Sequence, residues 1–168
     1  MDFTKMAWDL IHNNRFLSLA TTNRKGEVWI TPLSYSVDSE YNFYITTAID
    51  SLHIDNIKEN PFVAFSIYDS TRRVSDIDGL QIKGIMGQVE NSQLPSIVKN
   101  YYLQVFPDPI ERAEWEADWQ HFTEDDFPVY RFFQITPIEM YKRDTSTDEV
   151  DRRVMIDLEI LKNINSCH

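Results

Sequence analysis

The chain has 168 residues, of which 26% are charged and 13% are aromatic, and its formal net charge is −11 at pH 7. This length predicts one domain over residues 1–168. The negative charge, with no run of more than two basic residues, disfavours binding to nucleic acid. The histidines at positions 12, 53, 121 and 168 are too scattered to indicate a metal site.

Cellular location is indicated by the cysteine content and by the N-terminal residues. The single cysteine, Cys167, allows no intrachain disulfide, which is typical of a reducing compartment. The first residues lack the basic region and apolar run of a signal peptide, and no later apolar stretch is long enough to cross a bilayer. A cytoplasmic protein without a membrane segment is therefore expected.

The N-terminal part of the chain predicts a helix and a hairpin. Residues 2–13 place apolar side chains at i, i+3 and i+4, which indicates an amphipathic helix on a core. Strand formers on both sides of the turn at 23–26 predict the hairpin. Pro32 cannot donate a ladder hydrogen bond, so residues 31–36 should be an edge strand or a bulge whose backbone groups are available to a ligand.

The stretch 43–61 predicts a strand joined to a short helix by a polar turn. Asp50 or Ser51 would cap this helix through a side-chain oxygen, and Pro61 would end it. The N–H groups of a first helical turn lack intrahelical acceptors and lie at the positive end of the helix dipole, so they attract anions. This stretch is therefore the first candidate for an anion site.

Four polar side chains support that candidate. Thr46, Thr47 and Ser51 add hydroxyl groups. His53 would be a cation that opposes the helix dipole unless a bound anion offsets it. In the ordinary interpretation, Ser51 only caps, the threonines favour the strand and His53 is a neutral surface residue. On the local pattern alone, the ordinary interpretation is favoured over a phosphate site.

The strand that follows, residues 62–68, is almost wholly apolar, which predicts a central strand covered on both faces. The polar segment 69–78 comes next and contains Arg72 and Arg73. An exposed pair is the favoured interpretation of these arginines, and a second anion contact is the alternative.

A long strand is predicted over residues 79–90 by its alternating side chains. Gly84 and Gly87 within it indicate a bulge or a close approach of backbone. Apolar residues at helical spacing predict a helix over 94–105. It would belong to a helical insertion at about residues 93–126 between the strands.

A second helix in this insertion would place Trp115, Trp119 and Phe122 on one side, more readily as core or subunit interface than as a ligand platform. Two closing strands are predicted within residues 129–142, and a last short strand within 153–158. Six or more antiparallel strands with inserted helices make a barrel-like α+β domain.

The order of these elements resembles the flavin-binding split-barrel family of pyridoxamine 5′-phosphate oxidase over about residues 3–160. Three segments carry the resemblance: Thr31-Pro-Leu-Ser-Tyr-Ser36, Ser51-x-His53-x-x-Asn-Ile-x-x-Asn-Pro61 preceded by two threonines, and Gly79-Leu-Gln81-Ile-Lys-Gly84. The second is the most specific, because the family commonly has serine, a basic residue and Asn/Gln-Ile/Leu before Asn-Pro. The resemblance implies a mainly β (α+β) fold, an antiparallel six-stranded split β-barrel with flanking α-helices.

The resemblance also implies a cofactor, FMN, held at the interface of a homodimer. Thr46, Thr47 and Ser51 would contact the phosphate or ribityl chain, and His53 would replace the usual lysine of the family. With the resemblance, an FMN site becomes the favoured interpretation of residues 43–61. The high aromatic content also favours burial between two subunits.

Contacts to the flavin ring are implied for three other segments. Gln81 resembles the family glutamine whose amide donates to and accepts from the polar edge of the flavin. Tyr141 stands where the oxidases proper have a tryptophan that approaches the cofactor from the partner subunit. Four consecutive residues would line the ring with backbone groups: Thr31, Pro32, Leu33 and Ser34.

Two departures from the family pattern bear on affinity and substrate. Leu52 and His53 replace an Arg-Lys pair, and Thr31 stands where an arginine is expected, so less positive charge would hold the phosphate unless the arginines at 72–73 compensate. Oxidases of pyridoxamine phosphate also carry an Arg-x-His-x-x-Arg-like clamp near the C-terminus. Residues 150–154 read Val-Asp-Arg-Arg-Val without histidine, so that vitamer is not the expected substrate.

The implied activity is that of an FMN-dependent oxidoreductase acting on an unidentified small molecule, with NADH or NADPH as candidate electron donors. Two other interpretations stay open: a non-catalytic flavin-binding stress or sensor module, and a relative that binds a deazaflavin or haem on the same barrel. Tyr35, Lys83 and Tyr141 could all approach the ring, and nothing in the sequence selects one as acid or base.

Overall fold

The computed structural model describes residues 1–126, 128–144, 146–147 and 152–164, so Cys167, His168, Val150 and Asp151 lie outside the described residues. Within these ranges, eight strands form one sheet: β1 Phe16–Thr22, β2 Val28–Ser34, β3 Ser36–Val37, β4 Phe43–Ala48, β5 Phe62–Tyr68, β6 Gly79–Gln88, β7 Tyr130–Arg143 and β8 Arg153–Met155. The α-helices are α1 Phe3–Asn13, α2 Leu52–Glu59, α3 Leu94–Val105, α4 Pro109–Trp115 and α5 Leu158–Ile164. Three short 3-10 helices are η1 Val74–Asp76, η2 Asn91–Gln93 and η3 Trp119–Thr123.

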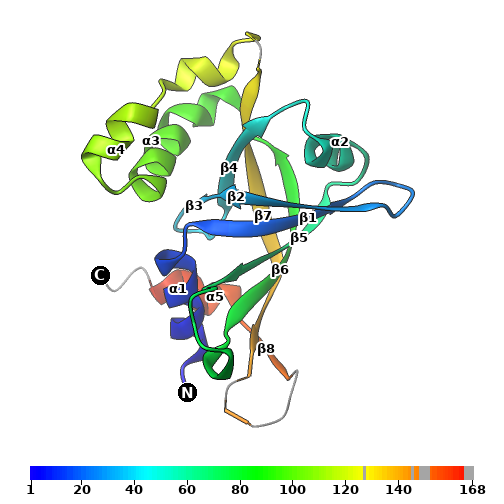
Figure 1. Cartoon of the computed structure of the whole chain (residues 1–168), viewed down its shortest axis with the longest axis vertical. Coiled ribbons are helices and arrows are strands. Elements are labelled where there is room, and N and C mark those ends of the chain that lie inside the picture. Colours follow the sequence, from blue (N-terminus) through cyan, green and yellow to red (C-terminus); the bar gives the residue numbers. More distant parts are fainter. Residues whose placement is uncertain (127, 145, 148–151, 165–168) are drawn as a thin grey trace.

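The antiparallel sheet curls on itself and forms the body of the molecule (Figure 1). Its strands pair in the order β2-β1-β5-β6-β7-β4-β3, and β8 pairs with β7. Because Tyr35 alone separates β2 from β3, the two ends of this order are consecutive in the chain and the pairing closes into a ring. The seven strands of the order make six when β2 and β3 count as one, which confirms the split-barrel prediction with β8 added.

The N-terminal elements follow the predicted pattern. The Asp2 carboxylate accepts a hydrogen bond from the Lys5 N–H at 2.9 Å and caps α1, whose buried face packs against the sheet. The β1–β2 hairpin turns at Gly26, whose φ of 80° is readily adopted by glycine. As predicted, β2 lies at the end of the pairing order, which is a position that tolerates Pro32.

Two apolar clusters hold the helices against the sheet. The larger cluster fills the inside of the curled sheet and includes residues of α1, α2 and α5. The second lies outside it, where Tyr44 of β4 and Phe132 of β7 pack against α3. All six residues of the predicted α3 stripe are buried there: Leu94, Ile97, Val98, Tyr101, Tyr102 and Val105.

The prediction that β5 is covered on both faces is wrong. Its side chains alternate between buried and exposed, and Phe62 and Tyr68 are 59% and 52% exposed. An antiparallel sheet can leave one face open, whereas the covered-strand prediction assumed helices on both sides. The outward side chains of β1, β2, β5 and β6 form a surface without a covering element, which we call the outer face.

The predicted helix through Trp115, Trp119 and Phe122 is also wrong as one element. α4 ends at Trp115, and Asp118 then caps the separate helix η3 by accepting a hydrogen bond from the Gln120 N–H. Phe122 is buried, whereas the exposed Trp115 ring stacks on Phe106 with the ring planes 8° apart. Three residues outside any helix, 116–118, separate α4 from η3, so the side chains do not form one stripe.

A bulge explains how one strand accommodates Pro137. The two predicted closing strands are the single strand β7, and the β6–β7 register shifts between Lys83 and Gly84, which skips Ile138. A Cβ on Gly84 would lie 2.8 Å from Thr136 O, which confirms the close approach predicted there. A Cβ on Gly87 would meet nothing within 4 Å, so the same prediction for Gly87 is wrong.

No described helix combines the length and the apolar character that a bilayer crossing requires.

Candidate functional site

His53 lies at the centre of a group of hydroxyls where β4 passes into α2. β4 ends at Ala48, and two turn residues lead to Ser51 and the first turn of α2, where His53 is 4% exposed. The ring Nε2 lies 2.9 Å from Thr47 Oγ1 and 3.1 Å from Ser51 Oγ. The ring Nδ1 lies 3.4 Å from Thr31 Oγ1. We call these four residues the hydroxyl cluster.

The hydrogen bonds of Ser51 determine the tautomer of the His53 ring. Ser51 Oγ donates its single proton to the Ala48 carbonyl at 2.8 Å, so towards Nε2 it can only accept. The neutral ring therefore carries its proton on Nε2 and leaves Nδ1 as an acceptor facing Thr31. Burial lowers the pKa of His53, because the charged ring would lose its hydration. The cationic role predicted for His53 thus requires a neighbouring anion that raises the pKa again.

The start of α2 has no side-chain cap, so the predicted capping by Asp50 or Ser51 is wrong. Ser51 occupies the N-cap position, but its hydroxyl turns back to the Ala48 carbonyl and towards the His53 ring. Among the described residues no side chain accepts hydrogen bonds from the first turn of α2 in the manner of a cap. The Ile54 N–H donates to the Ser51 carbonyl at 3.0 Å, so the N–H groups of Leu52 and His53 are the ones available to an anionic ligand.

Thr46 lies on the opposite face of β4 from Thr47, because successive strand side chains alternate. It is opposite Phe132 in the sheet, beside the second apolar cluster. The Thr46 hydroxyl is buried and has no hydrogen-bond partner. An unsatisfied buried hydroxyl destabilises a fold by about 1–3 kcal/mol, which a ligand could relieve.

The four residues of the proline strand point to different places. Thr31 joins the hydroxyl cluster, and Leu33 packs against the larger apolar cluster. Ser34 Oγ lies 2.6 Å from the hydroxyl of Tyr101 in α3. Pro32 is exposed. The structure therefore brings together four of the ten predicted site residues, namely Thr31, Thr47, Ser51 and His53.

Gln81 and Tyr141 belong to a separate hollow on the outer face. They stand opposite each other on β6 and β7, and the hollow has a volume of about 600 Å³. Ile30 and Ala64 contribute apolar walls. The Gln81 amide makes no hydrogen bond to any residue that the structure describes, so its donor and acceptor are both available. We call this the glutamine hollow.

A polar group lies beside the glutamine hollow that the sequence did not reveal. The Glu139 carboxylate accepts hydrogen bonds from Lys83 Nζ at 2.8 Å and from the Tyr141 hydroxyl at 3.0 Å. The bond from Lys83 lowers the pKa of Glu139, and the bond to Glu139 raises the pKa of Tyr141. The spacing of Glu139 and Tyr141 at i and i+2 on one strand was the signal that could have predicted their contact. The position of Lys83 opposite Glu139 depends on the bulged β6–β7 register, which the sequence does not show.

The hydroxyl cluster and the glutamine hollow lie on opposite faces of the sheet within one chain. Two neighbouring residues of β2 show this. Thr31, which belongs to the hydroxyl cluster, is opposite the buried Leu19 of β1. Ile30 is opposite Ala20, and both of these residues line the hollow. None of the four residues of the hydroxyl cluster lines the hollow.

Arg72 and Arg73 do not belong to the hydroxyl cluster of the same chain. They follow β5, whereas α2 precedes it, and a seven-residue strand spans about 23 Å. Arg72 Nε lies 3.6 Å from the Asp69 carboxylate. Within one chain, this separation therefore does not support the prediction that these arginines make up for the low positive charge at the phosphate site.

Sequence comparison identifies a matching family. The model described as pyridoxamine 5′-phosphate oxidase matches residues 3–144. A comparison with curated proteins finds no match to this sequence.

Solved structures share the fold at low identity. A heme binding protein from Mycobacterium smegmatis has a TM-score of 0.71 at 11% identity, with 97% of this chain and 61% of that chain covered. General Stress Protein 26 from Bacillus anthracis str. Sterne has a TM-score of 0.60 at 18% identity, with 93% and 100% covered. An F420 reductase has a TM-score of 0.54 at 18% identity, with 79% and 93% covered.

Proposed function

Because the chain belongs to the pyridoxamine 5′-phosphate oxidase family, we propose that it is an FMN-dependent oxidoreductase that acts on a small molecule. The observation that carries the proposal is the hydroxyl cluster at the uncapped start of α2. Hydroxyl groups and free N–H groups at a helix start are suitable donors to a phosphate. The cluster would hold the phosphorylated end of the cofactor.

The donor set fits a phosphate held by little formal charge. Thr31 and Thr47 contribute hydroxyls that can rotate to donate, and the Ser51 hydroxyl can donate when it leaves the Ala48 carbonyl. No arginine or lysine belongs to the cluster. A phosphate beside His53 would raise the pKa of the ring and turn Nδ1 from an acceptor into a donor. We therefore expect affinity to increase as the pH falls towards the ordinary pKa of histidine.

The glutamine hollow is suited to orient a flat polar ring. The unengaged amide of Gln81 can donate to one ring atom and accept from another, and Ile30 and Ala64 shield the ring from water. Glu139 holds the Tyr141 hydroxyl at 3.0 Å, which orients that side chain at the rim. When bound, FMN would supply the hydride or electron transfer.

A homodimer would let one cofactor contact both sites. In one chain they lie on opposite faces of the sheet, so we propose that one subunit supplies the hydroxyl cluster and its partner supplies Gln81 and Tyr141. The outer face supports this, because large apolar side chains are exposed on it without a covering element. They include Phe16, Ile30, Phe62 and Ile85.

The absorption spectrum of the purified protein, followed by titration with FMN, tests the proposal. We expect flavin absorption or binding of added FMN with a Kd of about 1–10 μM. Thr47→Val and Ser51→Ala should each weaken binding about tenfold, because each removes a donor to a charged group. Ser96→Ala, which removes an exposed hydroxyl from α3, is the matched control. Colourless protein that does not bind FMN would contradict the proposal.

A flavin-binding sensor without turnover is the second candidate, and the relative named General Stress Protein 26 favours it. The two functions differ in their response to NADH or NADPH under anaerobic conditions. Rapid loss of flavin absorption would indicate an enzyme. A flavin that stays oxidised with both donors would indicate a sensor.

Haem and deazaflavin binding are suggested by the relatives described as a heme binding protein and an F420 reductase. A haem iron would need an axial ligand, and none of the described histidines lines the glutamine hollow. They are His12, His53 and His121. The same absorption spectrum separates these cofactors, because their visible bands differ.

A further inference from the structure

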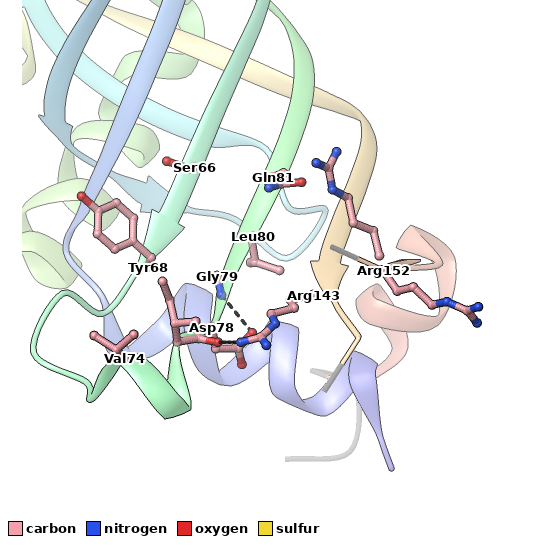
Figure 2. A pocket seen from close by; sticks show the side chains of 11 residues that line it. Ser66, Tyr68, Val74, Asp78, Gly79, Leu80, Gln81, Arg143 and Arg152 are labelled. Carbon is pink, nitrogen blue, oxygen red and sulfur yellow. Dashed lines mark hydrogen bonds between the residues drawn. The ribbon is translucent and has the colours of Figure 1, made fainter. Parts of the chain in front are cut away.

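Three arginines gather beside the glutamine hollow. Arg143 at the end of β7, with Arg152 and Arg153 before and within β8, lines a second hollow of about 410 Å³ (Figure 2). This hollow shares Ser66, Gln81 and Arg153 with the glutamine hollow, so the two are adjacent on the outer face. We call it the arginine hollow.

Two of the three arginines, Arg143 and Arg153, form no ion pair with a carboxylate that the structure describes. Arg143 and Arg153 stand directly opposite each other on β7 and β8, where like charges are destabilising. Arg143 donates to the Ile77 carbonyl at 3.0 Å, and neither arginine forms an ion pair with any residue that the structure describes. The lining carboxylate of Asp78 is engaged by Lys142 Nζ at 2.6 Å. A bound anion would supply the counter-charge that no described residue provides for Arg143 and Arg153.

The opposite wall of the hollow is apolar. Tyr68, Val74 and Ile77 line it and are each more than half exposed. Figure 2 shows Tyr68 and Val74 on the side of the hollow away from Arg152. A charged side facing an apolar side suits a ligand that has both characters.

We propose that the arginine hollow binds a small organic acid. Its carboxylate or phosphate would lie between Arg143 and Arg153, whose guanidinium forks match either oxyanion. Its apolar body would lie against Tyr68 and Val74. Because Gln81 lines both hollows, the acid would lie next to the cofactor ring as substrate, and this assignment rests on the proposed function.

Binding of four small probes to the full-length protein tests the site. Benzoate and phenyl phosphate combine an apolar body with an oxyanion, whereas acetate lacks the body and benzyl alcohol lacks the charge. We expect a Kd of about 1 mM for the better of the first two by calorimetry, and binding about tenfold weaker for acetate and benzyl alcohol. The preference between benzoate and phenyl phosphate identifies the oxyanion. Benzoate and phenyl phosphate that bind no more tightly than benzyl alcohol would overturn the proposal.

Arginine variants locate the bound anion. Arg153→Gln and Arg143→Gln should each weaken binding of the preferred probe about tenfold, because each removes a charged donor. The Arg153 side chain makes no hydrogen bond or ion pair with the described residues, and Arg153→Gln keeps the backbone pairing of β8 with β7, so this replacement should leave the fold intact. Arg24→Gln, in the β1–β2 turn, removes the same charge elsewhere and should leave binding unchanged. An equal loss with Arg24→Gln would show that general charge, and not this hollow, holds the probe.

Titration with FMN separates this inference from the proposed function. If FMN binds and the preferred probe then shifts the flavin spectrum, the acid lies beside the ring. If FMN binds but no probe does, the arginine hollow is wrong and the cofactor proposal stands. If the probes bind in an arginine-dependent way but FMN does not, the anion site stands and the cofactor proposal fails.

Discussion

At the scale of single residues, His53 makes the stability of the fold depend on pH. Burial lowers the pKa of the folded ring below its ordinary value of 6.5, which the unfolded chain keeps. As the pH falls through 6.5, the His53 ring takes up a proton in the unfolded state before it does so in the folded state. The free energy of unfolding should therefore decrease, and then level off below the pKa of the folded ring.

Urea unfolding of the protein without cofactor, between about pH 7.5 and about pH 5.5, checks this dependence. The wild type should lose more stability than His53→Gln over this range. The lowered pKa of His12 is present in both proteins, so its effect cancels in the difference. A difference that does not change with pH would show that the buried ring does not titrate in this way.

The buried pair of Lys142 and Asp78 gives a second residue-scale prediction. The Lys142 side chain has no exposed surface, and its Nζ lies 2.6 Å from Asp78 Oδ1. Asp78→Asn should lower the free energy of unfolding by about 3 kcal/mol, because it leaves a buried ammonium without a carboxylate. Lys142→Met added to Asp78→Asn should recover part of this loss.

Urea unfolding at neutral pH measures these changes, and Glu139→Gln is the control. It breaks the exposed pair with Lys83, and such pairs contribute less than about 1 kcal/mol. Equal effects of Asp78→Asn and Glu139→Gln would show that burial does not distinguish the two pairs.

At the scale of elements, the bulge between β6 and β7 depends on Gly84. A Cβ there would lie 2.8 Å from both Ile135 Cγ2 and Thr136 O, and the backbone oxygen cannot rotate away. Gly84→Ala should lower the free energy of unfolding by about 1–3 kcal/mol. Gly87→Ala, in the same strand, meets nothing within 4 Å and should be near neutral.

Thermal or urea unfolding of the two alanine variants makes the comparison. If Gly84→Ala is as stable as Gly87→Ala, the strands do not approach as closely as the bulge requires.

Elements with a regular apolar period were predicted well, because the period identifies the side that a core will cover. α1 and α3 follow this rule, and all six predicted stripe residues of α3 are buried. The prediction that both faces of β5 are covered failed, because a continuous apolar run does not reveal whether another element covers the second face of a strand. The prediction of one helix through Trp115 and Trp119 failed because their helical spacing spans a break after which Asp118 caps a new helix, although Trp119 does pack against the second apolar cluster.

At the scale of the whole molecule, the exposed outer face predicts a homodimer. Light scattering should return a mass of twice 19.9 kDa. Ile30→Glu and Phe62→Glu place charges on this face and should shift the protein towards the monomer. The reason is that dimer formation would bury an unpaired carboxylate in the interface, which costs free energy.

Ile110→Glu is the control, because Ile110 is also exposed but lies on α4, away from the outer face. A wild-type protein that is monomeric at all concentrations would contradict the shared cofactor site. The same result would leave the arginine hollow untouched, since its lining residues come from one chain.

The sequence by itself determined the family, the order of most elements and the position of the hydroxyl-rich turn before α2. These properties are local, because side-chain periodicity, turn residues and a short motif are all read within about twenty consecutive positions. The clustering of Thr47, Ser51 and His53 followed from the same short stretch.

The tertiary structure alone decided which distant residues meet and on which face of the sheet they lie. Thr31 reaches His53 while its neighbour Ile30 lines the glutamine hollow, and Arg143 lies opposite Arg153. Such placements depend on strand register, where a shift of one residue moves every side chain to the other face. Register is set by the bulge and by the closure of the whole ring, so a single stretch of sequence does not contain it.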